Sequence, residues 1–172
     1  MDWKQDNTFC CDAGIKASAT TMVIKMGKLY GWDYSGITEN NNDVYAPIDL
    51  KWVYYNSQKK YRYALEIKQR NASSTDYDDV MFEWQKIKCL RQAIKEGYRG
   101  YFFNYWDKDD VFEIYDLSKI TDDEIRTGYS YQKAHTKGEQ YADEEKRKIK
   151  KAYMPRNHKA IVLRGKLSEW MQ

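Results

Sequence analysis

Residues 48–68 read IDLKWVYYNSQKKYRYALEIK and contain the clearest structural pattern in the chain. In both of its halves apolar residues recur at every second position, which is typical of β-strands with one buried face. The polar residues 56–60 between the halves predict a turn. If the turn is centred between Ser57 and Gln58, each apolar residue meets an apolar partner, in the pairs Ile48–Ile67, Leu50–Leu65, Trp52–Tyr63 and Tyr54–Tyr61. A shift by one residue would mix the two faces, so we predict a hairpin in this register.

The other face of the predicted hairpin brings two acids together. The same register places Asp49 opposite Glu66, with Cβ atoms roughly 4.5–5.5 Å apart, and Lys68 lies two residues further along that face. Like charges in this position destabilise a sheet, and a divalent metal would offset the repulsion because carboxylate oxygens are the ligands that Mg²⁺ prefers. The alternative is a solvated polar face on which Lys51, Arg62 and Lys68 neutralise the two acids. The register alone leaves both interpretations open.

The rest of the chain predicts helices and strands around this hairpin. One helical pattern runs over 6–31, and a second follows the acidic segment 76–79 and ends at Gly97. The apolar stripe of the second helix is Val80, Trp84, Ile87, Leu90 and Ile94. The remaining predicted elements are a second hairpin, a charged helix and a last strand, at 101–105 with 111–115, at 140–151 and at 160–163. This order predicts a single α/β or α+β domain over residues 1–172.

The two acids and the lysine also form a known motif. Asp49, followed after sixteen residues by Glu66-Ile67-Lys68, resembles the D-x(n)-E-x-K signature of the PD-(D/E)xK (restriction-endonuclease-like) nuclease superfamily. Residues 64–70, ALEIKQR, look like the version of the motif found in small phage-type and bacterial members. The sequence departs from the superfamily pattern in having Ile48 directly before the aspartate, with Pro47 one place earlier. It also lacks the Q-x3-Y pattern of the RecB-type exonuclease branch after the motif.

The resemblance implies a fold with definite boundaries. The superfamily has an αβββαβ core, a mixed sheet flanked by helices, in which the hairpin carries the motif. Here the core would span about residues 10–116, and a basic C-terminal helical extension would occupy about residues 117–172.

The resemblance also implies a site. Asp49 and Glu66 would bind Mg²⁺ or Mn²⁺ together with the backbone carbonyl of Ile67, and Lys68 would position the attacking water. A third acid would come from one of three candidates, Asp33, Glu39 or Asp43. The accessory candidates are Glu83, Lys86 and Arg70. Glu83 and Lys86 equally fit an exposed ion pair three residues apart, and Arg70 an ordinary surface arginine.

The activity implied by the resemblance is metal-dependent hydrolysis of DNA phosphodiester bonds, by an endonuclease acting on phage or branched DNA. Many relatives work as dimers, so a homodimer is one expected arrangement. Two alternatives stay open. One is a catalytically inactive nucleic-acid-binding or assembly module with the same fold, and the other is a protein-interaction domain without a nucleic-acid role.

The charge distribution favours a nucleic-acid partner more than the total charge does. The formal net charge is only +3, but residues 133–166 hold 11 basic and 4 acidic side chains. We expect phosphate contacts from the basic residues of this stretch, namely Lys133, Lys137, Lys146, Arg147, Lys148, Lys150, Lys151 and Arg156. The alternative is a solvated helix in which the acidic residues 143–145 precede the basic run, an order that suits the helix dipole.

Cysteine content and hydropathy predict a cytoplasmic protein without a membrane partner. Cys10, Cys11 and Cys89 are odd in number and show neither disulfide nor zinc spacing, which is typical of a reducing compartment. The apolar run at 22–24 is too short to cross a membrane.

Overall fold

A computed structural model describes residues 18, 19, 21, 22, 25, 37–40, 48–55, 60–133 and 146–172. For residues 37–40, 52, 54, 55, 130–133 and 146–149 it describes the backbone only. The strands are β1 (Ile37–Asn40), β2 (Leu50–Tyr55), β3 (Lys60–Arg70), β4 (Asp79–Glu83), β5 (Arg99–Trp106), β6 (Val111–Asp116), β7 (Arg126–Lys133), β8 (Lys146–Pro155) and β9 (Ile161–Lys166). The helices are α3 (Trp84–Lys95), α4 (Leu167–Trp170) and the 3-10 turns η1 (Leu117–Lys119) and η2 (Asp122–Glu124).

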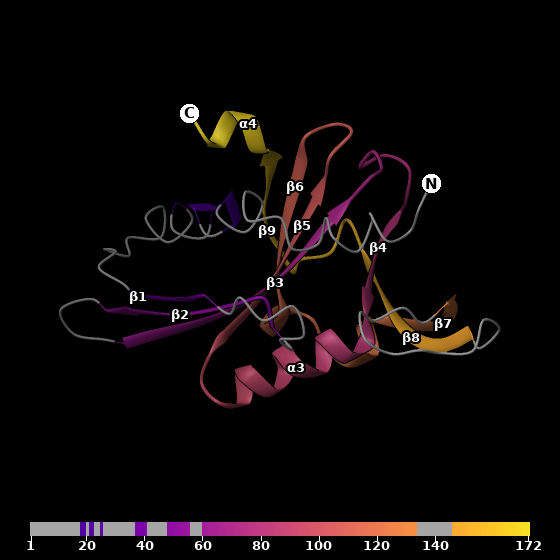
Figure 1. The fold of residues 1–172 in the computed structure, drawn as a ribbon, viewed down its shortest axis with the longest axis horizontal. Helices are drawn as coiled ribbons and strands as arrows, with labels where there is room; N and C mark the ends of the chain where they lie inside the picture. The colour runs from indigo at the N-terminus through magenta and orange to yellow at the C-terminus, as the bar shows by residue number, and fades with distance from the viewer. Residues whose placement is uncertain are drawn as a thin grey trace.

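A mixed sheet of six strands, in the order β1-β2-β3-β5-β6-β9, forms the centre of the molecule (Figure 1). Only β3 and β5 run parallel within this sheet, and β4 and α3 make the crossover between them. In the part of the first predicted helix that is described, Ser18, Ala19, Thr21, Met22 and Lys25 are helical. The chain order of helix, three strands, helix and strand therefore agrees with the predicted αβββαβ core, with β4 added before α3. The prediction of a mixed α+β fold with a sheet flanked by helices is confirmed.

The predicted hairpin forms in the predicted register. β2 and β3 pair antiparallel, with Leu50 opposite Leu65, Trp52 opposite Tyr63 and Tyr54 opposite Tyr61. The prediction that Ile48 shares the face of Leu50 is wrong. β2 begins only at Leu50, so the alternation does not extend to Ile48, which packs in a different core cluster from Leu50.

Both faces of β3 are buried, which corrects the expectation of a half-exposed strand. Ala64 packs with Ile87 and Leu90 of α3 on one face. Leu65 packs on the other face with the Met22 side chain of the first helix. Because β3 lies between β2 and β5 with a helix over each face, every residue from 63 to 67 is buried. Polar side chains on this strand, such as Glu66, therefore face protein instead of open solvent.

The second predicted helix is half strand and half helix. Residues 79–83 form β4, with Val80 and Phe82 buried, and α3 starts at Trp84. The apolar residues Ile87 and Leu90 continue the predicted stripe. Val80 does not belong to that stripe, because β4 pairs with β8, a partner some seventy residues away that the local pattern does not reveal.

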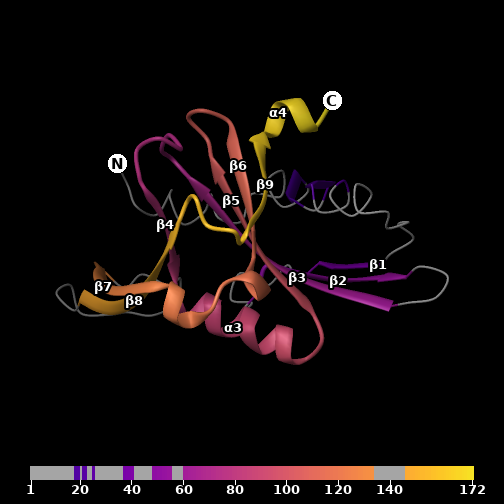
Figure 2. The ribbon, with the colours of Figure 1, turned by 180° about the vertical axis from the view of Figure 1, so that it is seen from behind.

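The predicted charged helix at 140–151 is also corrected where the chain is described. Residues 146–151 belong to β8, the central strand of a three-stranded antiparallel sheet in the order β4-β8-β7. Residues 140–145 lie outside the described part. β8 is a strand because Ala152 and Met154 alternate with the half-exposed Tyr153 and bury one face against the α3 core. Where it is described, the expected helical extension is thus largely β-structure: β9 joins the central sheet, and β7 and β8 form a small sheet with β4 that Figures 1 and 2 show beside the N-terminal end of α3.

The remaining predicted elements are confirmed. β5 and β6 form the second hairpin, with Phe103 opposite Ile114, and β9 adds to the edge of β6. None of the helices in the described part of the chain is long and apolar enough to cross a membrane.

Candidate active site

The candidate site centres on Glu66, a carboxylate buried under the first turn of α3. Glu66 lies on the same face of β3 as Ala64, which is the face covered by α3, and only 7% of the residue is exposed. The Nζ atom of Lys86, the third residue of α3, lies 2.8 Å from its Oε1. The other oxygen, Oε2, is buried and has no hydrogen-bond partner among the described residues. Glu66 therefore has one oxygen held by a lysine and one available to a cation.

Asp49, the residue directly before β2, lies next to the same part of β3. Its Oδ2 accepts a hydrogen bond from the backbone N–H of Ile67 at 2.8 Å. The carboxylate thus takes the position of a further strand partner for β3, beyond the last paired residues, Leu50 and Leu65. Because the N–H and C=O of one antiparallel strand residue point to the same neighbour, the Ile67 carbonyl lies on the same edge of β3 as Asp49. The structure brings together Asp49, Glu66 and Ile67, the three residues expected to bind metal.

Burial dominates the electrostatics of Glu66. Burial, and after it the negative charge of Asp49, raises the pKa of Glu66 to about 8, while the charge and hydrogen bond of Lys86 oppose this rise. Two acids close together in a buried place are costly for the metal-free fold. Such a pair is typical of a site that binds a cation or works as an acid or base.

The donor set fits a hard divalent cation. Two carboxylates and a backbone carbonyl are oxygen ligands of the kind that Mg²⁺ and Mn²⁺ prefer, with water and substrate phosphate completing the shell. The described residues contain no group of three or more acidic, histidine or cysteine side chains that could hold a metal on their own. Glu39 pairs with Lys51 through its backbone, and its side chain is not described. Asp33 and Asp43 lie outside the described residues.

Lys68 and Arg70 follow Glu66 on the same face of β3. The Arg70 guanidinium binds within the protein, donating to Asn104 Oδ1 at 2.5 Å and to the backbone carbonyl of Met81. These contacts tie β3 to β5 and β4. The sequence did not point to Asn104, which is fully buried, pairs in register with Lys68 and has an Nδ2 without a partner among the described residues. The available signal was an amide inside the apolar run 101–106.

Glu83, an accessory candidate, pairs with Lys151, and its negative charge also acts to raise the pKa of Lys86. Glu83 and Lys151 lie opposite each other on β4 and β8, with Lys151 Nζ 3.7 Å from Glu83 Oε1. Lys151 is 2% exposed. Burial lowers its pKa, Glu83 opposes this, and the charges of Lys68 and Arg70 lower it further. The expectation that Lys151 makes a surface phosphate contact is therefore corrected. Its side chain is a buried cation on β8 that is close enough to β3 to interact with the charges of Lys68 and Arg70.

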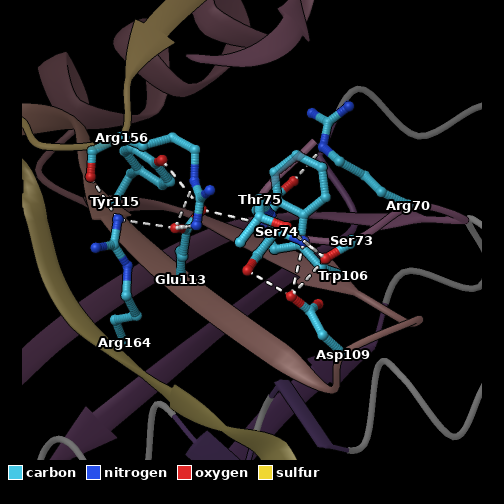
Figure 3. Close-up of polar contacts among 11 residues, drawn as sticks. Arg70, Ser73, Ser74, Thr75, Trp106, Asp109, Glu113, Tyr115, Arg156 and Arg164 are labelled. Carbon is cyan, nitrogen blue, oxygen red and sulfur yellow. Dashed lines mark hydrogen bonds and ion pairs between the residues drawn. The ribbon is translucent and has the colours of Figure 1, made fainter. Parts of the chain in front are cut away.

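Arg156, another expected phosphate contact, belongs to a buried cluster around Glu113 (Figure 3). Glu113 is fully buried and its Oε1 accepts from Arg156 at 2.6 Å and from Arg164 at 2.8 Å. Its Oε2 accepts from Trp106 Nε1 at 3.1 Å and from the Tyr115 hydroxyl at 3.3 Å. All four donors are satisfied by one carboxylate, so this cluster joins β5, β6 and β9 and leaves Arg156 with a structural role.

The other basic candidates lie on the β7–β8 pair. Lys150 is half-buried, and its ammonium lies 4.5 Å from the centroid of the Trp84 ring. The backbone places Lys133 opposite Lys146 and Lys148 opposite Tyr131, with Arg147 between them on β8. The side chains of these residues are not described, and Lys137 lies outside the described residues.

Comparison with known proteins adds one structural likeness. No protein-family model and no curated protein matches the sequence. Among solved structures, the chain is similar to Hjc of the archaeal hyperthermophile Archaeoglobus fulgidus, described as a Holliday junction resolvase. The two share 11% identity, the likeness covers 89% of this chain and 93% of that one, and the TM-score is 0.37.

Proposed function

We propose that this protein is a metal-dependent nuclease of the restriction-endonuclease-like class. The observation that carries the proposal is the state of Glu66: Lys86 holds one oxygen at 2.8 Å, and the other is buried beside Asp49 without a partner among the described residues. An unsatisfied buried carboxylate oxygen is costly in a purely structural site. A divalent cation between Asp49 and Glu66 would satisfy it.

Each residue then has a chemical task. Asp49 and Glu66, with the Ile67 carbonyl, would hold Mg²⁺ or Mn²⁺. Such an ion, when bound, acidifies water and offsets the charge that develops on a phosphate during hydrolysis. Lys68 would orient the attacking water next to the phosphate. Lys86 makes the ionised form of Glu66 less costly and holds its Oε1, so it is a positioning residue.

The substrate proposed for this chemistry is DNA, cleaved internally at branched or phage-type structures, with a homodimer as the working form. The D-x(n)-E-x-K resemblance and the basic composition of β8, KRKIKKAYMP, support this choice. The second candidate is an inactive nucleic-acid-binding module of the same fold. It is favoured by the presence of only two acids around the site in the described part of the chain, fewer than the three that the resemblance often implies.

Three single variants test the reaction. D49A, E66A and K68A should each abolish cleavage of duplex, branched and single-stranded DNA in Mg²⁺ or Mn²⁺, while circular dichroism shows the wild-type fold. Titration calorimetry with Mn²⁺ should show binding to the wild type and to K68A, but not to D49A or E66A. Cleavage at wild-type rate by any of the three variants would overturn the proposal. Wild-type DNA binding without Mn²⁺ binding or cleavage would support the inactive module.

A further inference from the structure

Three side chains lie side by side at the junction of α3 with β7 and β8; we call Trp84, Lys150 and Tyr129 the aromatic strip. Tyr129 and Lys150 are directly opposite each other on β7 and β8, so their side chains leave the same face of this pair. The Lys150 ammonium lies 4.5 Å from the centroid of the Trp84 ring. Tyr129 is 58% exposed, one of the most exposed large apolar side chains in the described part of the chain.

The strip shares helix α3 with the candidate site. Trp84 is the first residue of α3, and Lys86, which holds Glu66, is the third. From there Lys150 and Tyr129 continue across β8 and β7, the pair that extends beyond β4.

The surroundings of the strip are rich in positive charge. Five of the six residues at 146–151, KRKIKK, are basic. Glu83, the residue directly before Trp84, is an acid whose charge is paired with Lys151. A polyanion therefore fits this part of the molecule better than a neutral or cationic partner does.

From these observations we propose that the aromatic strip binds unpaired nucleotides of the nucleic acid. The inference rests on the proposed function and specifies its substrate, a strand with single-stranded character. Aromatic rings offer stacking surfaces that every base can use, and a lysine between them suits a backbone phosphate. In an intact duplex the faces of the bases are already stacked, so only unpaired nucleotides can use the rings.

The test compares the affinities of the wild type, Y129A and K150M for two fluorescent DNA probes in the absence of metal. One probe is a duplex with a single-stranded overhang, and the other is a blunt duplex. Y129A should weaken binding to the overhang probe by about 5-fold or more and leave the blunt duplex nearly unchanged. K150M should weaken both and lower the salt dependence by about one phosphate contact. A 2-aminopurine in the overhang should be quenched by the wild type and less so by Y129A.

Matched controls are available in the same chain. Tyr77 is also 58% exposed and lies against Trp106 of β5, so Y77A removes an equally exposed tyrosine outside the strip. Lys159 is an exposed lysine paired with Glu124, and K159M is the control for K150M. Equal affinities of Y129A and Y77A for the overhang probe would overturn the inference. It would also be overturned if polyglutamate displaced the probe as well as an unlabelled single strand does. Binding is measured without metal and does not depend on cleavage. If the wild type cleaved no DNA, that result would therefore count against the proposed nuclease and not against the strip.

Discussion

The Lys86 ammonium lies 2.8 Å from Oε1 of Glu66, so the first turn of α3 supplies the positive charge that a carboxylate of the central strand needs. The two residues are twenty positions apart and on different elements. Glu66 alone would be a desolvated acid next to Asp49, and Lys86 makes its ionised form less costly. Lys86 contacts only Oε1 of Glu66, so the buried Oε2 has no hydrogen-bond partner among the described residues.

Replacing Lys86 by methionine should therefore weaken metal binding without removing a metal ligand. K86M leaves Glu66 buried with no opposing positive charge, so its pKa rises further and a proton competes better with the metal. We expect Mn²⁺ affinity at neutral pH to fall by about 10-fold or more, measured by titration calorimetry. K88M, on an exposed position of the same helix, is the control and should bind Mn²⁺ like the wild type. Unchanged affinity in K86M would show that Lys86 does not position Glu66.

The stability of the metal-free protein should depend on pH through Glu66. Its pKa is 4.5 in the unfolded chain and about 8 in the folded protein, so between these values only the folded form keeps the proton. The free energy of unfolding should therefore fall as the pH rises from about 4.5 to about 8. In E66Q this decrease should be absent. Urea unfolding with a chelator present, across this pH range, measures both profiles, and parallel profiles would contradict the raised pKa.

The sequence predicted the hairpin well because its signal is local and continuous. The alternation in residues 50–55 and 60–67 has one register that pairs apolar with apolar residues, and the structure has that register. The prediction failed at Ile48, where the strand has not yet begun. Lys86 was only one of three accessory candidates, with Glu83 and Arg70, in the sequence. Its contact with Glu66 depends on where α3 lies over β3, which the packing of Ile87 and Leu90 decides.

The C-terminal region could not be predicted because its contacts are long-range. Local charge order at 140–151 suggested a helix, whereas β8 is a strand because β4 and β7 pair with both of its edges. Lys151 and Arg156 looked like surface cations for the same reason. Their acidic partners, Glu83 and Glu113, precede them by more than forty residues, and nothing in the local sequence indicates either pair.

Removing the Glu113 charge should destabilise the protein without affecting metal binding. E113Q removes the charge of a fully buried carboxylate that the half-buried Arg156 and the exposed Arg164 share. We expect the free energy of unfolding to fall by about 3–5 kcal/mol, measured by urea unfolding at neutral pH. D79N is a matched control, because it removes the exposed partner of Arg126 and should cost about 0–1 kcal/mol. Similar losses in the two variants would mean that the Glu113 cluster contributes no more than a surface pair.

Two substitutions of Asp49 should separate its structural contact from its charge. In D49A the backbone N–H of Ile67 loses its acceptor, which should lower the free energy of unfolding by about 1–3 kcal/mol. In D49N the side-chain carbonyl can still accept this hydrogen bond, so the stability should stay near that of the wild type. D49N also removes the negative charge that helps to raise the pKa of Glu66, and the pKa measured by carboxyl NMR should fall. Both variants should nevertheless lose Mn²⁺ binding. Alanine has no ligand atom, and the neutral amide of asparagine replaces a carboxylate poorly as a ligand for a hard cation. If D49N keeps the wild-type Mn²⁺ affinity, the charge of Asp49 is not needed by the metal, and the site must take its negative charge from elsewhere in the chain.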